Sequence, residues 1–208
     1  MALNYYKNEL KENAQLLASK GKGILAVDES TKTVGKRLAG IGVENTEENR
    51  KAYRGMLFTT EGLGKYISGA ILFEETLFQN HPDGESMVKK LNDLGIIPGI
   101  KVDKGLNPLP GGGDVETFCS GLDGLVERAA KYYEQGARFA KWRAVLQITG
   151  DGCPSKLSIQ ENAWGLARYA RSVQESGLVP IIEPEILMDG DHTIEKTAEV
   201  QEEVIKQV

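Results

Sequence analysis

Pairs of ionisable side chains follow three short apolar runs of this 208-residue sequence. They are Lys101 and Asp103, Lys141 and Arg143, and Glu183 and Glu185. Side chains two residues apart point to the same face of a strand, so we expect the members of each pair to lie together. Asp28 and Glu74 follow two further apolar runs. A buried charge without a partner is costly, so such a group must be mutually paired or bound to a ligand.

These residue types indicate a phosphorylated carbonyl substrate. Lysine and arginine hold phosphate oxyanions, a lysine crowded by a second cation attacks carbonyl groups, and carboxylates transfer protons. Zinc chemistry does not fit, because the only histidines, His81 and His192, show no metal-ligand spacing. We therefore expect neither a metal nor a cofactor. For any single pair a structural ion pair is the alternative, but charges after every apolar run favour a site.

The apolar runs alternate with amphipathic segments. Residues 95–101 and 177–183 share one template, a helix-ending glycine, two apolar residues, a proline, two further residues and a charge. Residues 136–141 are a looser copy. Thr46 is a plausible N-cap for one of the helices. Apolar periodicity predicts helices over residues 5–20, from 46 onward, 85–94, 122–135, 158–176 and 192–208.

This alternation predicts an α/β fold with a parallel sheet buried on both faces. A doubly wound sheet and a closed barrel both fit. No nucleotide-binding glycine motif follows a strand, and the glycines at 111–113 read as a turn in a proline-flanked loop. Charges at the carboxyl end of each strand favour the barrel. We expect one domain over 1–208, a (β/α)₈ TIM barrel truncated after about five βα units.

Composition excludes several other classes of protein. With 40% hydrophobic residues the chain can form a core, and its net charge of −5 argues against nucleic-acid and anionic-membrane partners. No apolar run approaches the roughly 20 residues that span a bilayer. The two cysteines form no disulfide framework. The N-terminal segment reads as neither a signal peptide nor a transit peptide.

Several long motifs occur in the order typical of one family. They are GKGILAVDES, GKRLAGIGVENTEENR, ISGAILFEETL, IPGIKVDKG, GLDGL, GARFAKWRAV, ENAWGLARYA and VPIIEPEI. They resemble the signature segments of class I fructose-bisphosphate aldolase, and GLGKYISGAILFEETL and AWGLARYA resemble its plant plastid form. The resemblance implies reversible cleavage of fructose 1,6-bisphosphate to dihydroxyacetone phosphate and glyceraldehyde 3-phosphate through a Schiff base. It also implies a homotetramer in the chloroplast stroma or the cytoplasm.

The resemblance also implies roles for individual residues. Asp28 matches the acid that assists carbon–carbon cleavage, Lys141 the lysine that helps form the carbinolamine, and Glu183 the group that dehydrates it. Glu185 is expected to orient its neighbours. The residues that match substrate-binding positions are Arg37, Arg50, Lys101 and Arg143. For Arg50, a position on the surface of a helix is an equally good expectation.

The sequence departs from this resemblance in two respects. Lys32 stands where a small or polar residue is expected. The family's Schiff-base lysine, in an LLKP-like motif on a sixth strand, is absent from this sequence. From the spacing of the first five strands along the chain, we expect that strand to begin beyond Val208. A sheet of five strands cannot close, so we expect exposed edges and an inactive chain. A truncated paralogue that keeps phosphate-binding or subunit-interaction surfaces is the alternative.

Overall fold

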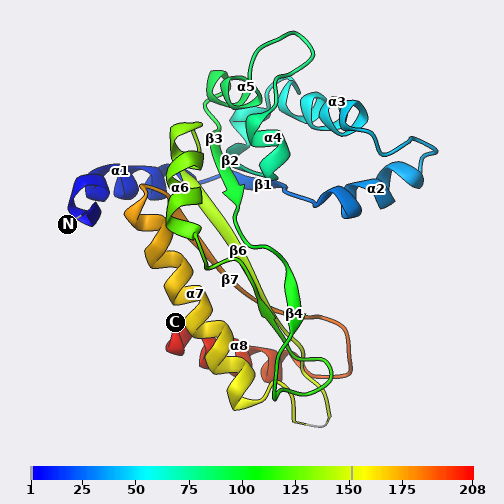
Figure 1. Ribbon diagram of the computed structural model, residues 1–208, viewed down its shortest axis with the longest axis vertical. Helices are drawn as coiled ribbons and strands as arrows, with labels where there is room; N and C mark the ends of the chain where they lie inside the picture. The colour runs from blue at the N-terminus through cyan, green and yellow to red at the C-terminus, as the bar shows by residue number, and fades with distance from the viewer. Residues whose placement is uncertain (1, 151) are drawn as a thin grey trace.

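The computed structural model describes residues 2–150 and 152–208, and it alternates strands with helices (Figure 1). The strands are β1 (Gly23–Val27), β2 (Ile67–Leu72), β3 (Ile97–Lys101), β4 (Leu106–Pro108), β5 (Thr117–Cys119), β6 (Phe139–Leu146) and β7 (Val179–Ile186). The helices are α1 (Ala2–Leu17), α2 (Thr31–Ala39), α3 (Glu47–Phe58), α4 (Glu74–Phe78), α5 (Met87–Asp93), α6 (Leu125–Glu134), α7 (Lys156–Glu175) and α8 (Ile194–Gln207), with a 3₁₀ turn η1 (Leu63–Lys65).

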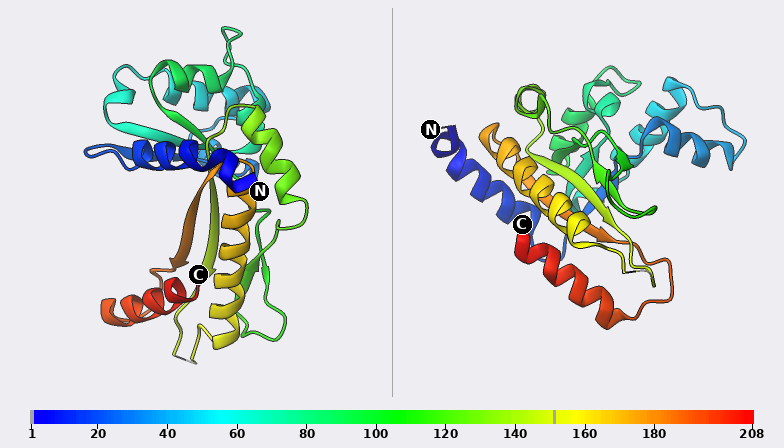
Figure 2. Two further views of the ribbon diagram at one scale, coloured as in Figure 1. Left: turned by 90° about the vertical axis from the view of Figure 1, so that its left-hand side faces the viewer. Right: turned by 60° about the horizontal axis from the view of Figure 1, so that its bottom comes forward.

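Five parallel strands form the main sheet in the order β1-β2-β3-β6-β7. Apart from β4 and β5, which pair separately, each strand lies beside the next one in the chain, and the sheet curls into half of a barrel (Figure 2). The predicted α/β fold with a parallel sheet is therefore confirmed. Thr46 caps α3 as predicted, since its side chain accepts a hydrogen bond from the Asn49 amide.

Two local features differ from the prediction that a helix follows each strand directly. The short antiparallel strands β4 and β5 stand between β3 and α6, and the glycine segment at 111–113 lies in the loop that joins them. Gly111 has a φ of +77°, which suits a glycine in a turn. The second feature is α2, which was not predicted and begins immediately after Ser30, its N-cap.

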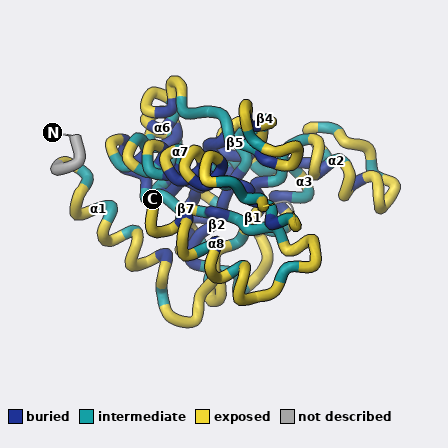
Figure 3. The backbone as a smooth tube through the Cα atoms, turned by 90° about the horizontal axis from the view of Figure 1, so that it is seen from below, coloured by how far each residue is buried: buried dark blue, intermediate teal, exposed yellow. Residues whose placement is uncertain are grey.

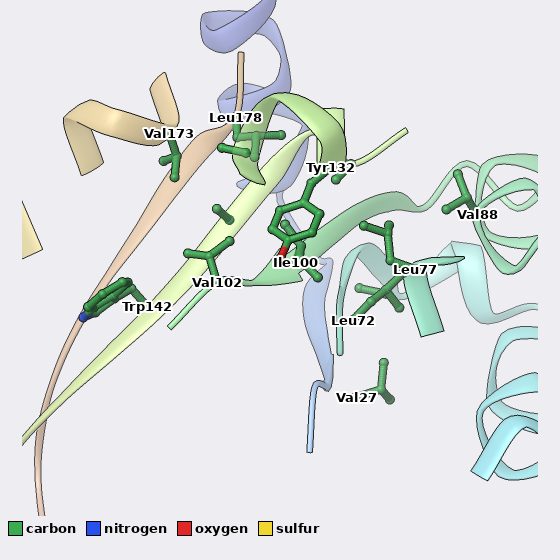
Figure 4. Packing of buried hydrophobic residues seen from close by; sticks show 14 of the residues in the cluster. Val27, Leu72, Leu77, Val88, Ile100, Val102, Tyr132, Trp142, Val173 and Leu178 are labelled. Atoms are coloured by element: carbon green, nitrogen blue, oxygen red, sulfur yellow. The ribbon is translucent and has the colours of Figure 1, made fainter. Parts of the chain in front are cut away.

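The two faces of the sheet have separate cores. The outward side chains, among them Leu72, Ile100 and Trp142, pack under the helices (Figure 4). Trp142 stacks on Tyr169 of α7 with ring centroids 5.4 Å apart. The inward side chains Ile71 and Phe139 pack with Leu17, the last residue of α1. Figure 3 shows exposed residues concentrated on the outer turns of the helices. Lys141 lies on the inward face of β6, two residues after Phe139.

The outer strands of the curled sheet each have one neighbour. Among the described residues β1 pairs with β2 alone and β7 with β6 alone, as predicted for a sheet that does not close. Apolar side chains are partly open on both: Ile24 is 39% exposed and Ile182 is 41% exposed. The two edge strands of the half-barrel thus leave apolar side chains open to solvent.

Candidate functional site

Lys141 is the centre of the charged group on the inner face. Its ammonium lies 3.1 Å from Asp28 Oδ2 and 3.3 Å from Glu183 Oε1. Asp28 directly follows β1, and the other two side chains project from β6 and β7. Three segments that are far apart in sequence therefore meet at one ion-paired cluster, as the strand pattern predicted.

The predicted position of these charges within their strands needs a correction. Lys141 and Glu183 do not end β6 and β7, because both strands continue to residues 146 and 186. Lys141 is instead level with Lys101, the last residue of β3, and Arg143 is level with Glu183. The longer strands β6 and β7 therefore extend past the cluster and form a wall beside it.

A cavity of about 640 Å³ opens beside Asp28 and Lys141, whereas Glu183 and Glu185 are not among its lining residues. It is lined by Asp28, Glu29, Ser30, Lys32, Thr33, Lys101, Asp103, Gly105, Leu106, Cys119, Lys141 and Arg143. Lys101 pairs with Asp103 Oδ1 at 2.5 Å, and Arg143 pairs with Glu185 Oε2 at 3.2 Å. Cations and carboxylates thus line one cavity, which is the arrangement needed to hold an anionic substrate and move protons on it.

The electrostatics of the cluster favour a cationic lysine and a protonatable carboxyl group. Burial disfavours the charged form of Lys141, but the carboxylates of Asp28 and Glu183 outweigh it and raise the pKa of Lys141. Burial also raises the pKa of Glu183, against the opposing effect of Lys141. Lys141 therefore stays protonated near neutral pH, while Glu183 takes up a proton more readily than an ordinary glutamate.

Two of the predicted substrate-binding residues lie outside the lining of this cavity. Arg37 is on α2, with a side chain that is 60% exposed, and it pairs with Glu29. Arg50 is on α3 and is buried, which corrects the surface position expected for it. Its guanidinium binds Glu75 through two hydrogen bonds, of 2.9 and 2.6 Å, and also contacts Asn45.

Glu74 does not join the cluster either. It begins α4, accepts a hydrogen bond of 2.8 Å from the Tyr132 hydroxyl and lies 3.5 Å from the Lys104 ammonium. Because the chain turns into α4 immediately after β2, this side chain faces α6 and the loop after β3 rather than the inner face. The charge that follows β2 is therefore separate from the site.

Sequence reasoning missed two contributors around Asp28. Glu29 lines the cavity, and its backbone carbonyl accepts a hydrogen bond of 2.6 Å from the fully buried Arg54. The guanidinium of Arg54 lies 3.9 Å from the carboxylates of both Glu29 and Glu75. Arg54 follows Arg50 by one helical turn, so a repeated arginine on one helix face was the available signal.

Other chemistries find less support in the described part of the chain. No group of three potential metal ligands is found there. Burial raises the pKa of the Cys119 thiol to about 12, so this cavity-lining cysteine stays protonated. A second cavity, of about 760 Å³, lies between α8 and the start of α7, but none of the predicted site residues line it. Within the described ranges no helix is long and apolar enough to cross a membrane.

Comparisons with known proteins identify relatives of this chain. Fructose-bisphosphate aldolase 3, chloroplastic, of Arabidopsis thaliana is 60% identical over 203 residues, 98% of this chain and 51% of that protein. Fructose-bisphosphate aldolase 1 of Toxoplasma gondii is 63% identical over 201 residues, 96% of this chain and 55% of that protein. A solved structure of Plasmodium falciparum fructose-bisphosphate aldolase, in a ternary complex with TRAP and a small-molecule inhibitor, matches with a TM-score of 0.93 at 57% identity. It covers 97% of this chain and 59% of that chain.

The half-barrel and the charged cavity at its strand ends place the chain among the (β/α)-barrel enzymes. A family model described as fructose-bisphosphate aldolase class-I matches residues 9–208. The chain belongs to the class I fructose-bisphosphate aldolase family. It spans about half the length of the curated relatives it matches.

Proposed function

We propose that this chain supplies the proton-transfer cluster and part of the phosphate-binding surface of a fructose-bisphosphate aldolase. The reaction is the reversible cleavage of fructose 1,6-bisphosphate to dihydroxyacetone phosphate and glyceraldehyde 3-phosphate. The observation that carries this proposal is the ammonium of Lys141, held 3.1 Å from Asp28 and 3.3 Å from Glu183 beside a cavity lined by further cations.

The three central residues divide the proton transfers between them. Lys141 stays cationic and stabilises negative charge that develops on the substrate oxygen during addition to its carbonyl. Glu183, with its raised pKa, donates a proton when the carbinolamine loses water. Asp28, which also pairs with Lys141, accepts the hydroxyl proton when the carbon–carbon bond breaks.

The remaining residues bind and position. Lys101 and Arg143 line the cavity and are assigned to a substrate phosphate, and Glu185 orients Arg143 through their ion pair. The exposed side chain of Arg37 supports a substrate-binding role at the rim. The guanidinium of Arg50 is already occupied by Glu75, which supports a role in joining α3 to α4.

The lysine that forms the Schiff base is proposed to lie outside these 208 residues. Attack on a carbonyl needs an uncharged amine. The pKa of Lys141 is raised, and Lys101 is held in an ion pair with Asp103. The amine of Lys141 is therefore not prepared for nucleophilic attack at neutral pH, and the relatives are about twice as long as this chain.

Borohydride trapping tests this assignment. The 208-residue chain is incubated with dihydroxyacetone phosphate and borohydride at neutral pH, and its mass is measured. We expect no reduced adduct on Lys141, because its raised pKa keeps the amine protonated, and none on Lys101, which is held in its ion pair with Asp103. A stoichiometric adduct on Lys141 or Lys101 would contradict the roles proposed for them.

The oligomer and the compartment are proposed on the family alone. We propose a homotetramer for the full-length protein. The plant relative is named chloroplastic and the Toxoplasma relative is not, so both the chloroplast stroma and the cytoplasm stay open as its compartment.

A further inference from the structure

Lys32 places a cation at the rim of the cavity from an element that is not part of the sheet. It is the second residue of α2, which begins directly after the Asp28–Ser30 segment. The helix is anchored there by Ser30, whose side chain accepts a hydrogen bond of 3.3 Å from the Thr33 amide. Lys32 lines the same cavity as Asp28, Lys101 and Lys141, although it is exposed to solvent.

Lys32 differs from the other cations of the cavity in its pairing. The ammonium or guanidinium groups of Lys101, Lys141 and Arg143 each lie within 3.2 Å of a carboxylate oxygen. No carboxylate lies within 4.0 Å of the Lys32 ammonium in the described part of the chain. A phosphate that approaches the first three must share them with their acidic partners, whereas Lys32 has no such competitor.

The position of Lys32 is not explained by the stability of α2. A cation in the first turn of a helix is opposed by the positive end of the helix dipole. The α2 sequence carries no acidic residue in that turn to offset the charge. The positive end of the helix dipole disfavours Lys32 when no ligand is bound, and it favours a dianion that binds beside this residue.

We propose that Lys32 is a specificity-determining residue that holds a phosphate group of the sugar at the α2 side of the cavity. This inference rests on the proposed function, because it assigns a residue to the phosphorylated ligand of the same site. The long, exposed side chain acts as a mobile point charge that reaches an oxyanion without fixed geometry. It favours phosphorylated sugars over neutral ones and adds to the phosphate contacts assigned to Lys101 and Arg143 a cation that no carboxylate shares.

The test measures the affinity of the 208-residue chain for fructose 1,6-bisphosphate and for fructose by titration calorimetry at low ionic strength. We expect Lys32→Ala to weaken binding of the bisphosphate about fivefold, as for loss of one exposed charge contact, and to reduce its salt dependence. Lys32→Arg restores the affinity to within about twofold, because it keeps the charge. Circular dichroism of each variant checks that the fold is retained.

Lys36→Ala is the matched control. Lys36 is an exposed lysine of the same helix that does not line the cavity. Its removal changes the net charge equally, and we expect it to alter the affinity less than twofold. If the chain binds the bisphosphate but Lys32→Ala and Lys36→Ala weaken binding equally, the role of Lys32 is overturned. The same holds if neither variant changes the affinity. Both results leave the proposed function standing. A wild-type chain that binds the bisphosphate no better than fructose would overturn the proposed function and the inference together.

Discussion

The ion pairs of Lys141 decide what this residue can do. A lysine buried without acidic neighbours loses its proton more easily and becomes a nucleophile. Here the carboxylates of Asp28 and Glu183 reverse that tendency, and the pKa of Lys141 is raised despite its burial. The residue is thus suited to stabilise charge and to pass protons on, rather than to form a covalent bond.

The variant Asp28→Asn tests whether the neighbouring carboxylates control the pKa of Lys141. Removal of one carboxylate leaves burial and Glu183 to set the pKa of Lys141, so we expect that pKa to fall below its wild-type value. The measurement is a pH titration of the lysine side-chain carbons by NMR. Asp93→Asn, which removes a carboxylate paired with Lys89 on the surface of α5, should leave the Lys141 titration unchanged. An unchanged titration in Asp28→Asn would show that the ion pair does not control the lysine.

The same pKa has a consequence for stability. Because the folded-state pKa of Lys141 lies above the ordinary value of 10.5, its contribution to stability is fully present below that pH. The contribution is lost as the pH rises through the folded-state pKa.

At the residue scale the sequence predicted most of the charges that gather, but it wrongly included Glu74 and missed some of their neighbours. Strand alternation is a local property, so it correctly placed Lys141 and Glu183 on one face. Lys32 and Cys119 reach the cavity from α2 and β5, and their positions depend on the path of the chain beyond the sheet. The burial of Arg50 depends on Glu75, which is 25 residues away.

At the scale of elements, close packing between strands fixes where the charged cluster lies along them. Phe139 of β6 is fully buried, and its ring fills the space left by Gly99 of β3 and Gly69 of β2. A Cβ atom on Gly99 would lie only 2.2 Å from the Phe139 ring. Because Lys141 and Lys101 follow on the same two strands, this contact also sets the distance between the two lysines.

Gly99→Ala should therefore destabilise the fold. The methyl group forces the buried ring of Phe139 and the strand apart, and we expect the free energy of unfolding to drop by about 2 kcal/mol. Chemical denaturation measures this change. The control is Gly23→Ala in β1, where an added Cβ meets no atom within 4 Å, and we expect a change below about 0.5 kcal/mol. Equal stability of the two variants would contradict the packing described.

Long elements were more predictable than short ones. The amphipathic pattern of α7 extends over 20 residues, and the helix was predicted close to its observed bounds. The hairpin strands β4 and β5 have three residues each, too few for an alternating pattern to be recognised. The nine-residue α2 buries only Val34 and Leu38, so its apolar stripe was too weak to indicate a helix.

At the scale of the whole molecule, the curled sheet brings together groups that are separated by more than 150 residues. Asp28 and Glu183 stand on the two outer strands of the half-barrel and still flank one lysine. Curvature makes this contact, because in a flat sheet the first and fifth strands would lie four interstrand spacings of about 4.8 Å apart. The site thus depends on the half-barrel keeping its curvature.

We expect the charged side chains on the inner face of the half-barrel to bind a phosphorylated sugar at one cavity. The most direct test is an NMR titration of the isotope-labelled chain with fructose 1,6-bisphosphate, with fructose as the neutral comparison. We predict that the bisphosphate alone perturbs resonances at Asp28, Lys101, Lys141 and Glu183 together, with one common affinity. Perturbations centred on the cavity between α7 and α8, or scattered over the surface with different affinities, would contradict the account.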